Sequence, residues 1–341
     1  MSDATTAMGA VAGLATAASS AAICVCLILI LRPALRRYAL AKPNERSSHE
    51  EPTPQGGGIA VIFATITVAS LGISGLGVPV GSPLVTVWGA AIAMAGVGVT
   101  DDIRPLGVLP RLLLQAIAVA ALIYALPEDL RVIAGLPKWA ERTFLFFSAL
   151  WLVNLVNFMD GIDWITVAEV VPITAALAVI GFLGVLSLDA LVVSLALGGD
   201  MIGFSYFNRP VAKLFLGDVG SLPIGLLLGW LLALLAGRGF LTAAILLPLY
   251  YLADATLTLL RRLWNGEKFW RAHRSHFYQR ATDRGLRVTE VVARVFAVNL
   301  GLAALAVVTV VFRRSTTDVV ALLCGVALVG WLLNALARGR S

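Results

Sequence analysis

Eleven long apolar segments divide the chain, and most are close to the length that a helix needs to cross a bilayer. About 20 mostly apolar residues span the hydrocarbon region. Lipid offers no partners for backbone hydrogen bonds, so a lipid-embedded segment must satisfy its own, as a helix does. The segments cover residues 9–31, 57–77, 84–100, 112–126, 142–157, 164–182, 187–205, 221–237, 240–260, 290–312 and 318–337. The pattern predicts an all-α, polytopic integral membrane protein with about 10–11 transmembrane helices.

The composition excludes the soluble classes. Charged residues make up 13% of the chain, against about 25% in soluble domains. The net charge of +6 could suggest nucleic acid, but in a membrane chain it indicates basic loops, so no nucleic acid is expected. The three cysteines lie in apolar runs without metal-ligand spacing. We expect a single domain over 1–341, with the polar motifs in 42–280 and two final helices in 290–341.

The basic residues predict the orientation. With eleven crossings, one face holds the connections after the first, third, fifth, seventh and ninth segments, together with the C-terminus. That face carries 19 lysines and arginines and the other carries 6. By the positive-inside rule the richer face is cytoplasmic. All the polar motifs fall on this face, so the sequence predicts a cytoplasmic active site.

Two motifs supply carboxylates and amides at ends of apolar segments. "GVTDDIRPLG" holds Asp101 and Asp102, whose mutual repulsion would favour a nearby cation; a solvated helix end is the simpler interpretation of this pair taken alone. "NLVNFMDGIDWIT" contains two amides and two carboxylates at helical spacing: Asn154, Asn157, Asp160 and Asp163. Asparagines can link membrane helices, but polar groups this dense inside an apolar segment indicate a site.

Two glycine-rich motifs precede apolar segments. In "KLFLGDVGSLPIG", Asp218 lies between Gly217 and Gly220. It could be an ordinary helix N-cap, or it could bind phosphate through a metal ion. In "HEEPTPQGGGIAV", the triple glycine at 56–58 is similar to a phosphate-cradling turn, although such turns are common.

The chain's three histidines all lie in polar connections. His273 and His276 are three residues apart in "FWRAHRSHFYQR", and His49 precedes the triple glycine. Zinc binding is disfavoured because no cysteine accompanies them, and a basic loop lying against anionic lipid is an alternative. We interpret the two paired histidines as part of a cationic clamp for a diphosphate. Its arginines are Arg271, Arg274 and Arg280.

Together, the acidic, amide and basic groups on one membrane face predict Mg²⁺-dependent phosphoryl transfer between a cytoplasmic nucleotide and a membrane lipid. A secondary transporter with interfacial carboxylates is the alternative. Transporters tend to place substrate groups near the bilayer midplane within internal repeats, and no repeat is apparent to us here. A lipid-phosphate phosphatase is a third interpretation, distinguished by its release of inorganic phosphate.

Five motifs in this order resemble the polyprenyl-phosphate N-acetylhexosamine-1-phosphate transferase superfamily, which is glycosyltransferase family 4. They are "RSSHEEPTPQGGG", "GVTDDIRPLG", "NLVNFMDGIDW", "KLFLGDVGSLPIG" and "HRSHFYQR". The last is closest to the branch that starts O-antigen or capsule repeats; phospho-MurNAc-pentapeptide translocase is a more distant relative. The resemblance implies transfer of N-acetylhexosamine 1-phosphate from a UDP-sugar to undecaprenyl phosphate, with release of UMP. It leaves the sugar and the glycan pathway open.

The resemblance and the residue patterns together assign the expected site. Catalytic roles are expected for Asp101, Asp102, Asp218, His273 and His276. Substrate binding is expected for His49, Asn154, Asn157, Asp160, Asp163, Arg271, Arg274 and Arg280. The metal, Mg²⁺ with Mn²⁺ as a substitute, is expected on Asp218, Asn154 and Asp160.

The expected partners are the UDP-sugar, undecaprenyl phosphate and the lipid bilayer, with a homodimer left open. The expected location is the bacterial inner membrane, with a periplasmic N-terminus and a cytoplasmic C-terminus if there are eleven helices. Asp254 lies in an apolar segment near the cytoplasmic end, and we expect it to face the site. One departure from the family is Trp164, because many members have a small residue there.

Overall fold

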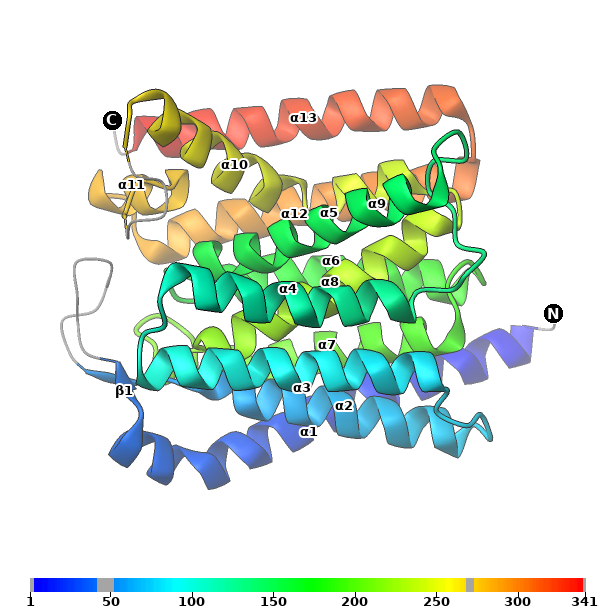
Figure 1. Cartoon of the computed structure of the whole chain (residues 1–341), viewed down its shortest axis with the longest axis horizontal. Helices are drawn as coiled ribbons and strands as arrows, with labels where there is room; N and C mark the ends of the chain where they lie inside the picture. Colours follow the sequence, from blue (N-terminus) through cyan, green and yellow to red (C-terminus); the bar gives the residue numbers. More distant parts are fainter. Residues whose placement is uncertain (1–2, 42–51, 268–272, 340–341) are drawn as a thin grey trace.

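The protein is a bundle of long helices, with almost no strand, in a computed structural model that describes residues 3–41, 52–267 and 273–339 (Figure 1). Ten of the described helices are long and apolar enough to cross a membrane. They are α1 (Asp3–Tyr38), α2 (Gly57–Gly75), α3 (Ser82–Ile103), α4 (Val108–Ala125), α5 (Lys138–Met159), α6 (Ile165–Phe182), α7 (Leu188–Ser205), α8 (Asp218–Gly237), α12 (Val288–Phe312) and α13 (Ser315–Arg338). The all-α, polytopic prediction is confirmed.

The ninth predicted segment, 240–260, is broken. It forms α9 (Leu241–Leu246) and α10 (Leu249–Trp264) on either side of Pro248, where proline supplies no backbone N–H to continue the helix. Neither piece is long enough to cross a bilayer alone. Together they still run from one end of the bundle to the other, so the chain's ends lie at opposite ends of the bundle (Figure 1).

Helix α8 forms the centre of the bundle. It packs against α3 and α5 and also contacts α2 and α9, and 17 of its 20 residues are buried. An apolar helix that is covered on every side is a core element rather than a lipid-facing one. The outer helices instead expose large apolar side chains, among them Leu14, Phe63, Ile117 and Leu323. The core therefore fixes the start of α8, where Asp218 lies.

The polar connections gather at one end of the bundle (Figure 1). A short antiparallel pair, β1 (Leu40–Ala41) and β2 (Thr53–Pro54), closes the α1–α2 connection there. The seven-residue helix α11 (Phe277–Asp283) lies at the same end, beside α13. Motifs that are more than 100 residues apart in the chain thus come within reach of one another.

Candidate active site

A cavity of about 620 Å³ lies at this polar end, between the ends of α3, α4, α5, α8 and the segment that leads into α11. It gathers seven of the thirteen predicted site residues: Asp101, Asn154, Asn157, Asp160, Asp218, His273 and His276. Ligand pockets typically measure about 300–1,000 Å³. The cavity is therefore large enough for a nucleotide-sized ligand.

Two carboxylates from different helices converge on one guanidinium in this cavity. Asp101 Oδ2 lies 3.0 Å from Arg111 Nη1, and the same nitrogen lies 3.9 Å from Asp218 Oδ2. The other oxygen of Asp101 accepts a 2.6 Å hydrogen bond from Leu106 N. Without a cation between them, two adjacent carboxylates would repel each other. The arrangement therefore requires positive charge at this point, and Arg111 supplies it.

Asp102 has a different position from its neighbour Asp101. Its carboxylate accepts hydrogen bonds from the backbone N–H groups of Asp218, at 3.0 Å, and Val219, at 3.2 Å. These amides begin α8 and have no partner within the helix, and a negative charge is favourable there. Asp102 is not among the residues that line the cavity. The sequence analysis predicts that the two aspartates form one acidic site. In the structure, Asp102 instead binds the backbone of Asp218.

The two asparagines of α5 also differ. Asn157 donates to Asp218 Oδ1 at 2.7 Å and to Ser221 Oγ at 3.0 Å. Asn154 instead donates to Gln115 Oε1 at 3.0 Å, and to the Leu150 carbonyl at 2.8 Å. Both line the cavity. Asp218 is thus hydrogen-bonded to Asn157, whereas the predicted metal set contains Asn154.

Asp160 is a partly buried carboxyl group at the end of α5. Its Oδ1 accepts a 2.5 Å hydrogen bond from Thr166. Desolvation raises the pKa of Asp160 from its ordinary value of 3.8 to about 7, and the charges of Asp102 and Asp163 add to the rise. Asp163 is buried and accepts from Ala212 N at 3.0 Å. Asp163 thus ties the α5–α6 turn to the α7–α8 connection, and it is not among the residues that line the cavity.

Trp164, the departure from the family pattern, starts α6 with a left-handed backbone, at φ +64°. This conformation favours glycine. The tryptophan is anchored on both sides, because its backbone N–H donates to Asn208 Oδ1 at 2.8 Å and its indole N–H donates to the Ser205 carbonyl at 2.6 Å. These contacts offset the backbone strain.

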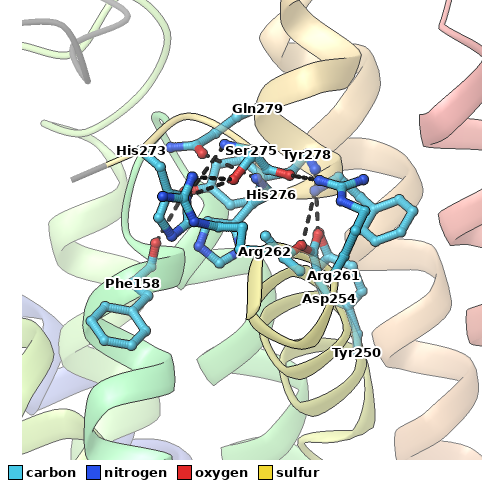
Figure 2. Close-up of polar contacts among 12 residues, drawn as sticks. Phe158, Tyr250, Asp254, Arg261, Arg262, His273, Ser275, His276, Tyr278 and Gln279 are labelled. Carbon is cyan, nitrogen blue, oxygen red and sulfur yellow. Dashed lines mark hydrogen bonds and ion pairs between the residues drawn. The ribbon is translucent and has the colours of Figure 1, made fainter. Parts of the chain in front are cut away.

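The histidine segment, residues 273–276, lines the cavity through His273 and His276. A set of polar contacts holds it in place (Figure 2). Arg261 donates to the Ser275 carbonyl at 2.8 Å, and Ser275 Oγ lies 2.9 Å from His273 Nδ1. Tyr278 OH donates to the Phe158 carbonyl at 3.3 Å. A Cβ on Gly161 would lie 2.2 Å from this hydroxyl oxygen, so glycine is needed where α11 packs on the α5–α6 turn.

Arg274 and Arg280, the two predicted arginines that the structure describes, are not among the residues that line the cavity. Arg274 forms a 2.8 Å ion pair with Asp283. Desolvation lowers the pKa of Arg280, and the nearby charges of Arg261 and Arg284 lower it further. Positive charge is thus concentrated around α11. The two remaining predicted residues, His49 and Arg271, lie outside the described residues.

The donor atoms at this site fit Mg²⁺. Magnesium in proteins prefers oxygen ligands, and it usually takes one or two carboxylates plus substrate phosphates and water. Asp101 and Asp218 converge on one point, and the side-chain amide of Asn157 adjoins Asp218. Within residues 3–41, 52–267 and 273–339, no group of three or more His, Cys, Asp or Glu could hold a metal ion. A bound magnesium ion would therefore need phosphate oxygens to complete its ligands.

Sequence reasoning missed two polar groups on α4, at or near the cavity. Arg111 lines the cavity, and Gln115 is completely buried, with its amide nitrogen lacking a hydrogen-bond partner in the described part of the chain. The two residues are four apart and so share a helix face. A glutamine inside an apolar segment is a sign of an interior contact, and it could have marked this face of α4.

The glycine turn at 56–58 does not form the phosphate cradle that its sequence resembles. The N–H groups of Gly57 and Gly58 donate to the carbonyls of Phe215 and Leu216, each at 2.9 Å. A Cβ on Gly58 would lie 2.1 Å from the Gly220 Cα. The glycines instead allow α2 to contact the start of α8 closely.

Comparisons with known proteins identify similar sequences. Residues 84–236 match the sequence model of glycosyl transferase family 4, a range that contains Asp101, Asn157 and Asp218. A probable undecaprenyl-phosphate N-acetylglucosaminyl 1-phosphate transferase of Bacillus subtilis is 25% identical over 278 residues, which is 76% of this chain and 75% of that protein.

Two further relatives have related names. The decaprenyl-phosphate N-acetylglucosaminephosphotransferase of Mycobacterium leprae is 26% identical over 335 residues, covering 86% of this chain and 82% of that protein. A phospho-N-acetylmuramoyl-pentapeptide-transferase of Streptococcus pneumoniae serotype 19F is 30% identical over 164 residues. This match covers 46% of the chain and 49% of the relative, so it spans about half of each.

Proposed function

We propose that the chain is a member of the polyprenyl-phosphate N-acetylhexosamine-1-phosphate transferase superfamily, as its sequence matches support, and that it transfers N-acetylhexosamine 1-phosphate from a UDP-sugar to undecaprenyl phosphate. The observation that carries the proposal is the convergence of Asp101, Asp218 and Asn157 beside His273 and His276 in one cavity. The lipid-linked sugar phosphate would start a cell-envelope glycan such as O-antigen or capsule.

The reaction is one phosphoryl transfer. An oxygen of the lipid phosphate attacks the sugar-linked phosphorus, the bond from that phosphorus to the bridging oxygen breaks, and UMP leaves with that oxygen. A phosphate monoester has a second pKa near 6, so much of the acceptor is already dianionic at neutral pH. The chain therefore needs to orient the acceptor more than to deprotonate it, and Asp101 lies where it can do so.

The cavity's charges support binding of two phosphorylated substrates. Asp101, Asp218 and Asn157 would hold Mg²⁺, which when bound neutralises phosphoryl oxygens. Arg111 and the histidines supply further positive or donor groups against the diphosphate. Like-charged phosphates can approach each other only where such groups surround them.

The cavity also has an apolar side. Leu112 of α4, Phe147, Leu150 and Trp151 of α5, and Leu259 of α10 line it. An apolar wall between membrane helices suits a prenyl chain that enters from the bilayer, while a nucleotide suits the polar end. We also propose that this end faces the cytoplasm of a bacterial cell, with Mg²⁺ as the physiological metal.

Release of UMP tests the proposal. Purified protein with undecaprenyl phosphate, Mg²⁺ and one of four donors (UDP-GlcNAc, UDP-GalNAc, UDP-QuiNAc or UDP-FucNAc) should release UMP with at least one donor. Asp218→Asn should lower the rate about 100-fold or more, because it removes a charge that acts in the transition state. Asp318→Asn is the matched control, because Asp318 lies in the first turn of α13 at the other end of the bundle.

Other outcomes would contradict the proposal. Release of inorganic phosphate would indicate a phosphatase, and sugar movement across vesicles without UMP would indicate a transporter. Full UMP release by Asp218→Asn would remove that residue from the metal site.

A further inference from the structure

Asp254 of α10 is a completely buried carboxylate that the proposed reaction does not use directly. Sequence reasoning expects it to face the site, yet it is not among the residues that line the cavity. It lies next to the histidine segment, where side chains of α10, the His276 ring and the first backbone N–H groups of α11 meet it (Figure 2). A buried carboxylate is costly unless it is hydrogen-bonded, so its contacts show what it holds.

Five groups converge on the two oxygens of Asp254. Oδ1 lies 3.3 Å from His276 Nδ1, 3.0 Å from Phe277 N and 3.4 Å from Thr258 Oγ1. Oδ2 lies 3.2 Å from Tyr250 OH and 3.3 Å from Tyr278 N. Two of these contacts come from α10 itself, and three come from the histidine segment and α11. The carboxylate thus fastens the histidine segment to the membrane helix beneath it.

The contacts indicate which nitrogen of His276 carries a proton. An ionised carboxylate can only accept hydrogen bonds, and a backbone N–H can only donate. Two backbone N–H groups and two hydroxyls already donate to Asp254. His276 Nδ1 can form a hydrogen bond with this carboxylate only if Nδ1 also donates. The position of the proton follows from the hydrogen-bond network, as it usually must for histidine. Nδ1 is therefore protonated.

The rest of the imidazole is also fixed. The His276 ring stacks on the Tyr278 ring at 5.8 Å and 19°, and its centroid lies 4.9 Å from that of His273. The side chain of His276 is almost wholly buried, at 2% exposure, yet it lines the cavity. Because Asp254 occupies Nδ1, Nε2 is the ring nitrogen left to meet a ligand. His273 differs, because its Nδ1 lies against the Ser275 hydroxyl.

We propose that Asp254 is a positioning residue for the reaction, which fixes the Nδ1–H form of His276 and so presents Nε2 to the phosphates of the nucleotide sugar. The proposal rests on the proposed function, because it names the ligand atoms that Nε2 meets. Asp254 touches no substrate itself and acts through the imidazole. With Nδ1–H held on Asp254, a proton on Nε2 lets the ring donate to a phosphate oxygen of the nucleotide sugar.

The proton position can be tested by ¹⁵N NMR of histidine-labelled protein in detergent. The chain has only three histidines, so His49→Gln and His273→Gln assign the His276 signals by subtraction. The wild-type protein should show Nδ1 of His276 protonated, in the neutral or the cationic ring. An unprotonated Nδ1 would overturn the proposal, and this measurement requires no variant of Asp254 to fold.

Kinetics then test whether the position matters for the reaction. Asp254→Asn should lower kcat for UMP release about 10- to 100-fold, the effect of one charge-assisted hydrogen bond, with a smaller change in KM. The fixed Nδ1–H signal should be lost as well, because an amide can also donate to Nδ1. Asp318→Asn provides the matched control.

A double-mutant cycle separates positioning from a purely structural role. In a His276→Gln protein, adding Asp254→Asn should lower residual UMP release less than about 2-fold, since the two residues act as one unit. If the two substitutions lower UMP release independently, so that their fold-changes multiply, the positioning role is overturned and Asp254 has only a structural role. If wild-type protein releases no UMP from any donor, the proposed function fails, while the NMR spectrum still decides whether Asp254 fixes the ring.

Discussion

At the scale of single residues, adjacent carboxylates have distinct surroundings. Asp101 faces the cavity and Arg111, while Asp102 turns back to hold the first amides of α8. The two side chains emerge from consecutive positions near the end of a helix, so they point in different directions. Asp101 is therefore placed to meet a ligand in the cavity, and Asp102 holds the backbone that carries Asp218.

Asp160 should make the protein's stability depend on pH. Its pKa is raised from 3.8 to about 7 in the folded protein, so between these values the folded state binds more protons than the unfolded state. The free energy of unfolding therefore falls as pH rises through this window. In metal-free detergent solution, the fall from pH 5 to pH 8 should be smaller for Asp160→Asn by at least about 1.4 kcal/mol, the value of one pKa unit.

Thermal unfolding of both proteins in EDTA at pH 5, 6, 7 and 8 measures this difference. Asp189→Asn, in the first turn of α7, should follow the wild-type curve. If stability depends on pH in the same way for wild type and Asp160→Asn, ionisation of Asp160 does not lower the free energy of unfolding, and the prediction is wrong.

The sequence identifies the residue types of the site but not their individual contacts. Helical spacing places Asn154 and Asn157 on one face, and both line the cavity. Whether Asp218 meets one or the other depends on how far α8 and α5 are shifted along each other, and no local pattern records that. Arg111 escapes notice for the same reason, because its partners lie on other helices.

At the scale of elements, glycines set the distance between α2 and α8. A Cβ on Gly58 would lie 2.1 Å from the backbone of Gly220, and backbone cannot move aside as a flexible side chain can. Gly58→Ala should therefore destabilise the protein by about 1–3 kcal/mol or more. It should also lower UMP release, because the start of α8 carries Asp218.

Gly89→Ala in α3 is the matched control, since nothing lies within 4 Å of its added Cβ. Alanine favours helix over glycine, so this variant should equal or exceed the wild type in thermal stability. Unchanged stability of Gly58→Ala would mean that the two helices can separate at no cost.

The elements also show where hydropathy stops being informative. The apolar segments predict the long helices to within a few residues at most ends, because lipid and core both select for apolar side chains. The break at Pro248 was within one predicted segment, 240–260. A window average cannot reveal it, since the residues next to the proline on both sides are apolar.

At the scale of the whole molecule, the proposed orientation can be tested with single cysteines. Asn265→Cys lies just after α10 at the polar end, and Glu128→Cys lies in the connection after α4 at the other end; both positions are exposed. In spheroplasts, a membrane-impermeant maleimide should label Glu128→Cys and spare Asn265→Cys until the membrane is permeabilised.

The native cysteines set the background for this experiment, because Cys24 is buried while Cys26 and Cys324 are exposed on membrane helices. The cysteine-containing parent protein is therefore labelled in parallel. Labelling of Asn265→Cys in intact spheroplasts would place the cavity outside the cytoplasm and remove access to UDP-sugars.

The sequence predicts the assembly of the site better than its details. Counting crossings puts every polar motif on one face, and in the structure seven predicted residues share one cavity there. The face on which a connection lies depends only on the number of crossings before it, so errors of a few residues at helix ends do not change it. Side-chain contacts of about 3 Å cannot be predicted from such a count. His49 and Arg271 lie outside the described residues. The homodimer remains a prediction.

The burial of α8 has a consequence for how such a protein can change over generations. A perimeter helix meets lipid along one side, and fluid acyl chains accommodate a leucine, a phenylalanine or a methionine almost equally. Helix α8 is surrounded by protein along most of its length, so each exchange there must fit a fixed volume. Substitutions should accordingly accumulate in the outer helices of the bundle. Residues of α8 should change only together with residues of the neighbouring helices.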